Sequence, residues 1–219
     1  MKNNCFESDI KQRLYQQFAR IGKSLSSDKR LEIIDILSNG PKSVDNLAKQ
    51  TGMSVANVSR HLKILLEAKL VRFQKKGTFV IYSVSDISVT HFLSSLWNLC
   101  ENRLADVKVI KDELNGQYEE VQHITKQDLV IKMQKNNVIL IDIRPIEEFI
   151  TSHIKGATSV PLEQLADYLQ TLTKDVELVA YCRGPYCSLA SQAVNYMQDQ
   201  GFTAYRIEEG VREWNTHVL

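Results

Sequence analysis

Residues 178–197 read LVAYCRGPYCSLASQAVNYM: an apolar run, a short loop with two cysteines, and a segment whose apolar residues have helical spacing. An apolar run that leads through a loop directly into a helix is typical of a buried strand in a parallel sheet. A second such run, VILIDI at residues 138–143, lies upstream, and amphipathic helical segments separate and follow the two runs. This alternation predicts that the C-terminal half is an α/β domain with a parallel sheet.

The loop that begins at Cys182 has the composition of an anion-binding site. In a strand–loop–helix unit, successive backbone N–H groups can point inward, and the helix that follows adds its positive end. A cysteine at the start of such a loop is expected to have a lowered pKa and to be a thiolate at neutral pH. Cys182 is therefore the candidate nucleophile. The residues expected to hold its charged product are Arg183, Gly184, Pro185, Tyr186, Cys187 and Ser188.

Two other roles for the cysteine pair are less well supported by the sequence. Zinc usually takes three or four protein ligands, whereas this half offers one cysteine pair and the scattered His123, His153 and His217. A structural disulfide is disfavoured because the N-terminal residues lack the apolar stretch of a secretory signal, and we expect a cytoplasmic protein with reduced thiols.

Three segments of the C-terminal half resemble the rhodanese family. They read VILIDIRPIEEFITSHIKGA at 138–157, YCRGPYCSLASQAV at 181–194 and GFTAYRIEEGVREW at 201–214, and the resemblance covers about residues 122–217. It implies a sulfurtransferase, in which Cys182 takes a sulfane sulfur from a donor such as polysulfide or thiosulfate and passes it to a thiol acceptor. It also implies scaffold roles for Asp142, Arg144 and His153, with contact between Arg144 and substrate as an alternative, and a core position for Trp214. Glu209 stands where the family commonly has glycine.

The length of the loop and its last cysteine are informative within this resemblance. The five residues from Cys182 to Cys187 match the sulfur-sized loop, whereas the related phosphatases have one residue more, so a phosphatase is not expected. Cys187 occupies the position where small rhodaneses commonly have arginine. It could be a passive replacement, or it could resolve a persulfide at Cys182 into a disulfide or trisulfide.

The N-terminal half reads as helices followed by a basic hairpin. Ser43 and Ser54 are candidate N-caps of two helices separated by a tight turn at residues 51–53. Strand-like runs at 70–73 and 79–84 flank a basic turn at 74–78, and one long helix is expected from about 86 to 114. Val55, Val58, Leu62 and Leu65 should form the inner face of the second helix. This order predicts a mostly α winged helix-turn-helix that places small and polar side chains in the major groove.

Residues 44–84, VDNLAKQTGMSVANVSRHLKILLEAKLVRFQKKGTFVIYSV, resemble the ArsR/SmtB family of bacterial repressors. The resemblance covers about residues 8–114 and implies a repressor that binds operator DNA as a homodimer formed by its first and last helices. Residues expected to contact DNA are Ser54, Ala56, Asn57, Ser59, Arg60, His61, Lys63, Lys75 and Lys76.

The family's inducer sites are only partly present. The Cys-x-Cys of its metal sensors is missing from residues 45–49, and Asp86 and His91 alone are too few ligands for a zinc site in the last helix. No metal and no cofactor are therefore expected. Cys100 resembles a thiol of persulfide-sensing members, whose usual partner position falls near Asp35; Cys5 could substitute. Alternatively, Cys100 is a small buried hydrophobe and Cys5 a frayed terminal residue.

Charge divides the chain in the same way. Residues 1–115 carry 18 lysines and arginines against 12 acidic residues, and residues 116–219 carry 9 against 14. A basic half joined to an acidic half suggests two domains with different partners, the basic one a polyanion. We expect a DNA-binding and dimerisation domain at 1–115, a linker at 116–122 and a rhodanese-like domain at 123–219. No apolar run is long enough for a membrane span.

These observations predict a transcriptional repressor that responds to sulfane sulfur or thiol stress through a persulfide at Cys182. Two alternatives remain: a sulfurtransferase whose DNA-binding domain regulates its own gene, and an arsenic- or metal-responsive repressor.

Overall fold

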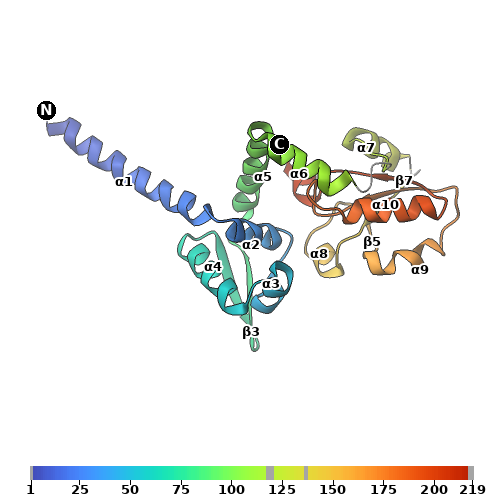
Figure 1. Cartoon of the computed structure of the whole chain (residues 1–219), viewed down its shortest axis with the longest axis horizontal. Helices are drawn as coiled ribbons and strands as arrows, with labels where there is room; N and C mark the ends of the chain where they lie inside the picture. The colour runs from blue at the N-terminus through green and yellow to red at the C-terminus, as the bar shows by residue number, and fades with distance from the viewer. Residues whose placement is uncertain (1, 117–120, 136–137, 217–219) are drawn as a thin grey trace. The chain divides into compact units, whose positions relative to one another are not determined.

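The computed structural model describes residues 2–116, 121–135 and 138–216, and the chain divides into two compact units, Met1–Thr90 and His91–Leu219. Figure 1 shows the helices and strands of each unit. No helix in the described ranges is long and apolar enough to cross a membrane.

The first unit is built from helices and a small antiparallel sheet. Its serine caps form as predicted: the Ser43 and Ser54 side chains accept hydrogen bonds from the N–H groups of Asn46 and Asn57. Its elements are α1 (Lys2–Leu25), α2 (Asp28–Ser38), β1 (Lys42–Ser43), α3 (Val44–Thr51), α4 (Val55–Glu67), β2 (Val71–Lys76) and β3 (Phe79–Val84).

The hairpin is longer than the sequence suggested. Strand β2 continues through the basic residues to Lys76, where the predicted turn should already have begun, because the pairing with β3 persists as far as Lys76 and Phe79. Only two residues form the turn, and Gly77 there has a φ of 61°, in the left-handed region that glycine adopts without strain. Strand β1, which the sequence analysis missed, pairs antiparallel with β3 and gives the strand order β1-β3-β2.

The prediction of a single helix from about 86 to 114 is wrong. The chain forms α5 (Ile87–Arg103) and α6 (Ala105–Gly116), with a break at Leu104. The N–H of Leu104 closes α5 on the carbonyl of Cys100, and Asp106 in the first turn of α6 favours a new helix N-terminus. Helix α5 begins in the first unit and continues into the second.

The second unit contains the predicted parallel sheet, with strand order β5-β4-β6-β7 and parallel pairing throughout. The remaining elements are α7 (Lys126–Gln134), β4 (Val138–Asp142), α8 (Ile146–Thr151), β5 (Thr158–Ser159), the 3-10 turn η1 (Leu162–Gln164), α9 (Leu165–Leu169), β6 (Glu177–Tyr181), α10 (Leu189–Asp199), β7 (Thr203–Arg206) and α11 (Val211–Thr216).

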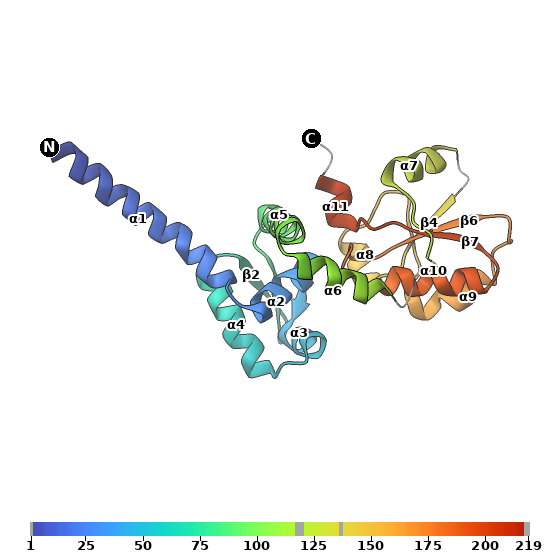
Figure 2. The same ribbon diagram turned by 45° about the horizontal axis from the view of Figure 1, so that its top comes forward.

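Both faces of this sheet are covered by helices. On β6, Leu178 and Ala180 pack into the cluster that includes α9 and α10, whereas Val179 and Tyr181 pack into the cluster that includes α7 and α11. Figure 2 shows α7 on one side of the sheet and α9 and α10 on the other. Burial on both faces explains why the strand sequences are continuously apolar rather than alternating.

Candidate functional site

The cysteine loop lies at the carboxyl edge of the parallel sheet. Strand β6 ends at Tyr181, the loop covers residues 182–188, and α10 begins at Leu189. The neighbouring strands β4 and β7 bring Asp142 and Arg206 to the same edge. In open α/β sheets this edge is where ligands bind, because the loops there converge while the strands hold them rigidly.

The two loop cysteines are free thiols in direct contact. Cys182 is only 2% exposed, and its Sγ lies 3.2 Å from the carbonyl oxygen of Cys187, to which it donates a hydrogen bond. Cys187 is partly buried and packs against the same apolar cluster as Cys182. The Cys182 thiol carries one proton, which can point either to that carbonyl or to the Cys187 sulfur.

The two thiols differ in acidity, and in the opposite sense to the prediction. Burial raises the pKa of Cys182 well above its usual value, and the side-chain hydrogen bond with Cys187 adds to this. The hydrogen bond from the Cys182 side chain lowers the pKa of Cys187 to about 6, and the N–H groups of Arg183 and Leu189 contribute. The expectation of a lowered pKa at Cys182 is therefore wrong for this structure. Cys187 is therefore the more acidic thiol of the pair.

A buried arginine beneath the loop was missed by the sequence analysis. Arg206 is 2% exposed; its Nη1 donates to Ser191 Oγ at 2.6 Å and to the Asn115 side chain. Its Nη2 makes longer contacts of 3.4 and 3.5 Å with the carbonyl oxygens of Pro185 and Cys187. The only sequence signal was an arginine ending an otherwise apolar strand. Although Cys187 stands where the family commonly has arginine, Arg206 supplies a cation from below.

A second arginine anchors the loop from outside. Arg183 makes a two-pronged ion pair with Glu148 of α8, with distances of 2.9 Å from Nε and 2.8 Å from Nη2. Glu148 is almost fully buried, so this pair is shielded from water and geometrically constrained. This pair holds the side chain of Arg183 against α8.

Asp142 and Arg144 form a buried scaffold, as the family resemblance implied. Arg144 donates to both oxygens of Asp142 and, through Nη2, to the carbonyl of Ser152 at 2.7 Å. The hydroxyl of Tyr181 donates to Asp142 at 2.6 Å and accepts from the N–H of Ile154. This network fixes the end of β6, from which the cysteine loop starts.

The backbone of the loop is held tightly by the segment that follows β7. Gly184 has a φ of 123°, which side-chain-bearing residues rarely adopt. A Cβ at Gly210 would lie 2.6 Å from the carbonyl carbon of Arg183 and 2.8 Å from the nitrogen of Gly184. Only glycine permits this approach, so Gly210 defines the shape of the loop.

The remaining loop residues face different surroundings. The Tyr186 hydroxyl donates to Glu101 of α5 at 3.3 Å, and Pro185 lines a cavity. Ser188 is the residue before α10, and its hydroxyl accepts a hydrogen bond from the Gln192 side chain at 3.2 Å. His153 is exposed and stacks on Phe149 with 3.9 Å between ring centroids. Trp214 packs, partly buried, against the cluster on the α7 side.

The helix-turn-helix residues lie in the first unit. Val58, Leu62 and Leu65 of α4 are fully buried, as predicted, but Val55, the first residue of the helix, is 47% exposed. Ser54, Ala56, Ser59, Arg60 and Lys63 are exposed, as are Lys75 and Lys76 on β2. Asn57 and His61 are partly buried, and His61 Nδ1 has no hydrogen-bond partner among the described residues.

Comparison with known proteins identifies both halves. The family "Bacterial regulatory protein, arsR family" matches residues 27–72, and the family "Rhodanese-like domain" matches residues 125–217. An HTH-type transcriptional regulator of Mycobacterium tuberculosis, Rv0324, is 36% identical over 208 residues, which cover 95% of this chain and 91% of that protein. The chain belongs to the ArsR-type regulators that carry a rhodanese-like domain. The predicted family and fold class are confirmed.

Two further relatives each match one half of this ArsR-type regulator. The arsenical resistance operon repressor of Bacillus subtilis is 33% identical over 87 residues, 39% of this chain and 83% of that repressor. The thiosulfate sulfurtransferase GlpE of Coxiella burnetii is 26% identical over 102 residues, 46% of this chain and 90% of that enzyme.

The other inducer sites that the sequence raised are a metal site and the thiols Cys5 and Cys100. Within the described ranges, no group of three or more His, Cys, Asp or Glu side chains could hold a metal ion. Cys100 of α5 is a partly buried free thiol. The side chain of Cys5 lies outside the described residues, so a link between Cys5 and Cys100 stays a prediction.

Proposed function

We propose that this regulator is a repressor whose rhodanese-like domain accepts sulfane sulfur at Cys182 and thereby changes its affinity for operator DNA. The observation that carries the proposal is the pair of contacting free thiols, Cys182 and Cys187, in a loop between β6 and α10 with a buried guanidinium beneath it. Two thiols and a fixed cation are what a site needs in order to form, hold and resolve a persulfide anion.

The first step is sulfur transfer without net oxidation. The thiolate of Cys182 attacks the outer sulfur of a persulfide R–S–SH; the S–S bond of the donor breaks, a new S–S bond forms at Cys182, and the proton leaves with R–SH. Because Cys187 is the more acidic thiol of the pair, it can accept the Cys182 proton across their contact, which leaves the attacking thiolate on Cys182. The persulfide anion then lies among the loop amides, above Arg206.

The second step would use Cys187. Cys187 gives its proton to the outer sulfur of the Cys182 persulfide, the Cys187 thiolate attacks the Sγ of Cys182, a disulfide forms between the two cysteines, and hydrosulfide leaves. The two thiols are oxidised and the sulfane sulfur is reduced to sulfide, so no further oxidant is required. The disulfide would therefore remain in the loop after the donor has reacted, until a cellular thiol reduces it.

The DNA-binding surface would be the exposed side of α4 together with the hairpin. Ser59, Arg60 and Lys63 project from α4, and Lys75 and Lys76 lie near the tip of the hairpin. Polar side chains on a helix that enters the major groove can read base edges, and lysines on a wing can neutralise phosphates.

Dimerisation would use α1. Ile10, Leu14 and Phe18 form a stripe at intervals of four residues, and these side chains are 46%, 49% and 59% exposed. A continuous apolar stripe on an exposed helix is costly in water and is normally covered by another chain. A second copy placed symmetrically would cover it, as a palindromic operator requires.

Contacts within the second unit offer a route from the loop to the helices that connect it to the DNA-binding half. Tyr186 bonds Glu101 of α5, and Arg206 bonds Asn115 of α6. Lys111 of α6 pairs with Glu101 at 2.9 Å. A bridged or persulfidated loop would shift Tyr186 and Cys187 and so disturb these bonds. Since α5 continues into the first unit, sulfur loading of the loop would act by changing the position of this helix.

Peptide-resolved mass spectrometry of the reduced protein after exposure to polysulfide tests the proposal. Sulfur at Cys182, or a sulfur bridge between Cys182 and Cys187, is the expected result, with no sulfur on Cys182→Ser. A folded wild-type protein that takes up no sulfur at Cys182 would refute the sulfur function and leave only the DNA-binding regulator.

A sulfurtransferase is the second candidate, favoured by the likeness of residues in the second unit to thiosulfate sulfurtransferase GlpE. Sustained turnover with thiosulfate and cyanide, together with unchanged DNA affinity in the presence of donor, would favour this enzyme role.

A further inference from the structure

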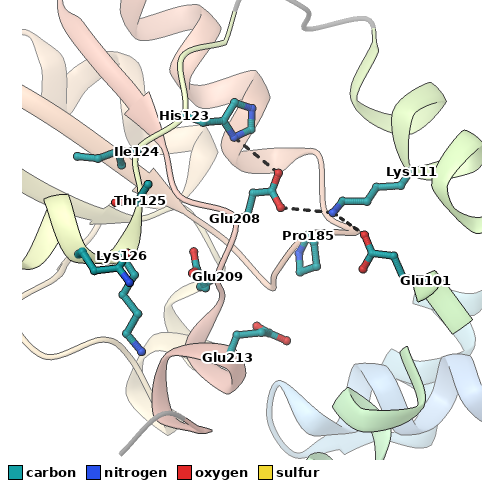
Figure 3. Close-up of a pocket in the computed structure, with 11 residues that line it drawn as sticks. Glu101, Lys111, His123, Ile124, Thr125, Lys126, Pro185, Glu208, Glu209 and Glu213 are labelled. Atoms are coloured by element: carbon teal, nitrogen blue, oxygen red, sulfur yellow. Dashed lines mark hydrogen bonds and ion pairs between the residues drawn. The ribbon is translucent and has the colours of Figure 1, made fainter. Parts of the chain in front are cut away.

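A cavity of about 550 Å³ lies beside the cysteine loop. Figure 3 shows it with the loop residue Pro185 at its wall and with three glutamates, from the segment that follows β7 and from α11, projecting around it. The charged residues that line it are Glu101, Lys111, Lys126, Glu208, Glu209 and Glu213. A volume of this size suits a small metabolite.

Most of these charges are already engaged. Lys111 pairs with Glu101 at 2.9 Å and with Glu208 at 3.3 Å. Glu213 accepts from the N–H of Gly210 at 3.0 Å. Lys126 donates to the carbonyl of Trp214 at 2.8 Å, but an ammonium group has two further donors.

Glu209 is the exception. Its side chain is partly buried, and within the described residues it has neither a hydrogen-bond nor an ion-pair partner. In Figure 3 it lies between Glu208 and Glu213 and is joined to no residue drawn. A carboxylate that loses part of its hydration without gaining a partner is unfavourable, so an occupant that carries a positive group would be stabilised there.

We propose that the cavity binds the amino-acid part of a cysteine-type persulfide, with Glu209 pairing with the α-ammonium group of the donor. The inference rests on the proposed sulfur function of Cys182 and adds the chemical class of its donor. Lys126 lines the same cavity and is placed to meet the α-carboxylate, so that both charges of a zwitterionic amino acid have a counterpart.

Glu209 lies close to the cysteine loop because Gly210, the residue that follows it, packs against the loop backbone. Gly210 packs so closely on the backbone of Arg183 and Gly184 that a Cβ there would overlap them. Pro185 of the loop itself lines the cavity. A donor whose ammonium group is held at Glu209 therefore has its persulfide end beside the loop that carries Cys182, and the transfer is the balanced exchange described above: R–S–SH loses its outer sulfur to Cys182 and leaves as R–SH.

The charges also disfavour thiosulfate. Four carboxylates and two ammonium groups line the cavity, so negative charge is in excess there. His123 does not offset this excess, because burial and the nearby Arg206 lower its pKa and favour the neutral imidazole. A dianion without a positive group would be repelled, whereas a zwitterion would be accepted.

The test compares two donors that differ only in the ammonium group: cysteine hydropersulfide and N-acetylcysteine hydropersulfide. Initial rates of sulfur incorporation at Cys182 are measured by mass spectrometry on the full reduced chain, over a range of donor concentrations. Wild type should prefer cysteine hydropersulfide by about tenfold or more in kcat/KM, the effect of one charge-assisted contact. Glu209→Gln should remove most of this preference, mainly through KM, whereas Glu163→Gln, an exposed glutamate outside the cavity, should keep it.

Equal rates with the two donors in wild type, or an unchanged preference in Glu209→Gln, would overturn the assignment of the cavity while leaving sulfur loading at Cys182 intact. Failure of both donors to load Cys182 would instead overturn the proposed function, and the donor assignment with it.

Discussion

Cys187 should be the more reactive of the two loop thiols toward alkylating agents. Hydrogen bonds hold its pKa at about 6, so its thiolate is present above that pH and is lost as the pH falls through it. Iodoacetamide at pH 7 should therefore label Cys187 before Cys182, and the rate should fall about tenfold per pH unit below pH about 6. Peptide mapping of singly labelled protein measures this. Preferential labelling of Cys182 would contradict the assignment.

Removal of Cys187 should separate the two sulfur steps. In Cys187→Ser, polysulfide should still load Cys182, but the persulfide should persist, because no second thiol lies beside it to attack it. Mass spectrometry should then find one added sulfur and no intramolecular bridge. A persulfide that decays as fast as in wild type would show that Cys187 is a passive replacement.

Arg206 should be a major stabilising residue of the second unit. Arg206→Gln would leave Ser191 and the carbonyls beneath the loop without their buried donor, which typically costs about 1–3 kcal/mol. Urea unfolding followed by the fluorescence of Trp97 and Trp214, both in the second unit, measures this loss. Lys155→Gln, which removes an exposed cation of the same unit, is the control and should change stability little. Equal stabilities of the two variants would contradict the structural role of Arg206.

For individual residues, the sequence predicted that Cys182 and Cys187 lie in one loop, but it did not predict the acidity of each thiol. The loop residues Cys182 and Cys187 were identified from their spacing, because a short loop between a strand and a helix leaves little conformational choice. The acidity of each thiol depends on burial and on which N–H groups point at it, and these arise from folding. Arg206 was missed for the same reason: it is 24 residues from Cys182 in sequence and reaches the loop only through the pairing of β6 and β7.

The close packing of the loop against the segment after β7 should tolerate no side chain. Gly210→Ala would force Cβ to within 2.6 Å of the backbone of Arg183, so the loop must move, at a typical cost of about 1–3 kcal/mol. We expect a lower thermal midpoint and much slower sulfur loading at Cys182.

Gly22→Ala is the matched control, because a Cβ at Gly22 in α1 meets nothing within 4 Å. It should leave sulfur loading unchanged and keep or raise stability, since alanine favours the helix. Normal loading in Gly210→Ala would contradict the view that this contact shapes the loop.

Elements with strong local signals were predicted well, and those specified by distant contacts were not. Ser43 and Ser54 identified helix starts because a cap acts within three residues. The two-residue strand β1 exists only because β3 lies beside it. The break at Leu104 carries no proline or glycine, so helical periodicity ran through it. The length of β2 was underestimated because pairing with β3 overrides the turn preference of its basic residues.

For the whole molecule, the central claim is that sulfur at Cys182 controls DNA binding. The two compact units share α5, the loop residue Tyr186 contacts α5, and Arg206 beneath the loop contacts α6. A change in the loop can therefore alter the helix that continues into the DNA-binding half.

The most direct test measures the affinity of the full chain for a DNA duplex that the reduced protein itself selects from a random library, by fluorescence anisotropy at fixed salt. Wild type and Cys182→Ser are compared with and without cysteine hydropersulfide, and sulfur loading is verified by mass spectrometry in the same samples. We predict that the donor weakens DNA binding by wild type at least fivefold, a typical coupling between sites, and leaves Cys182→Ser unchanged. Equal affinities for loaded and unloaded wild type would contradict the account.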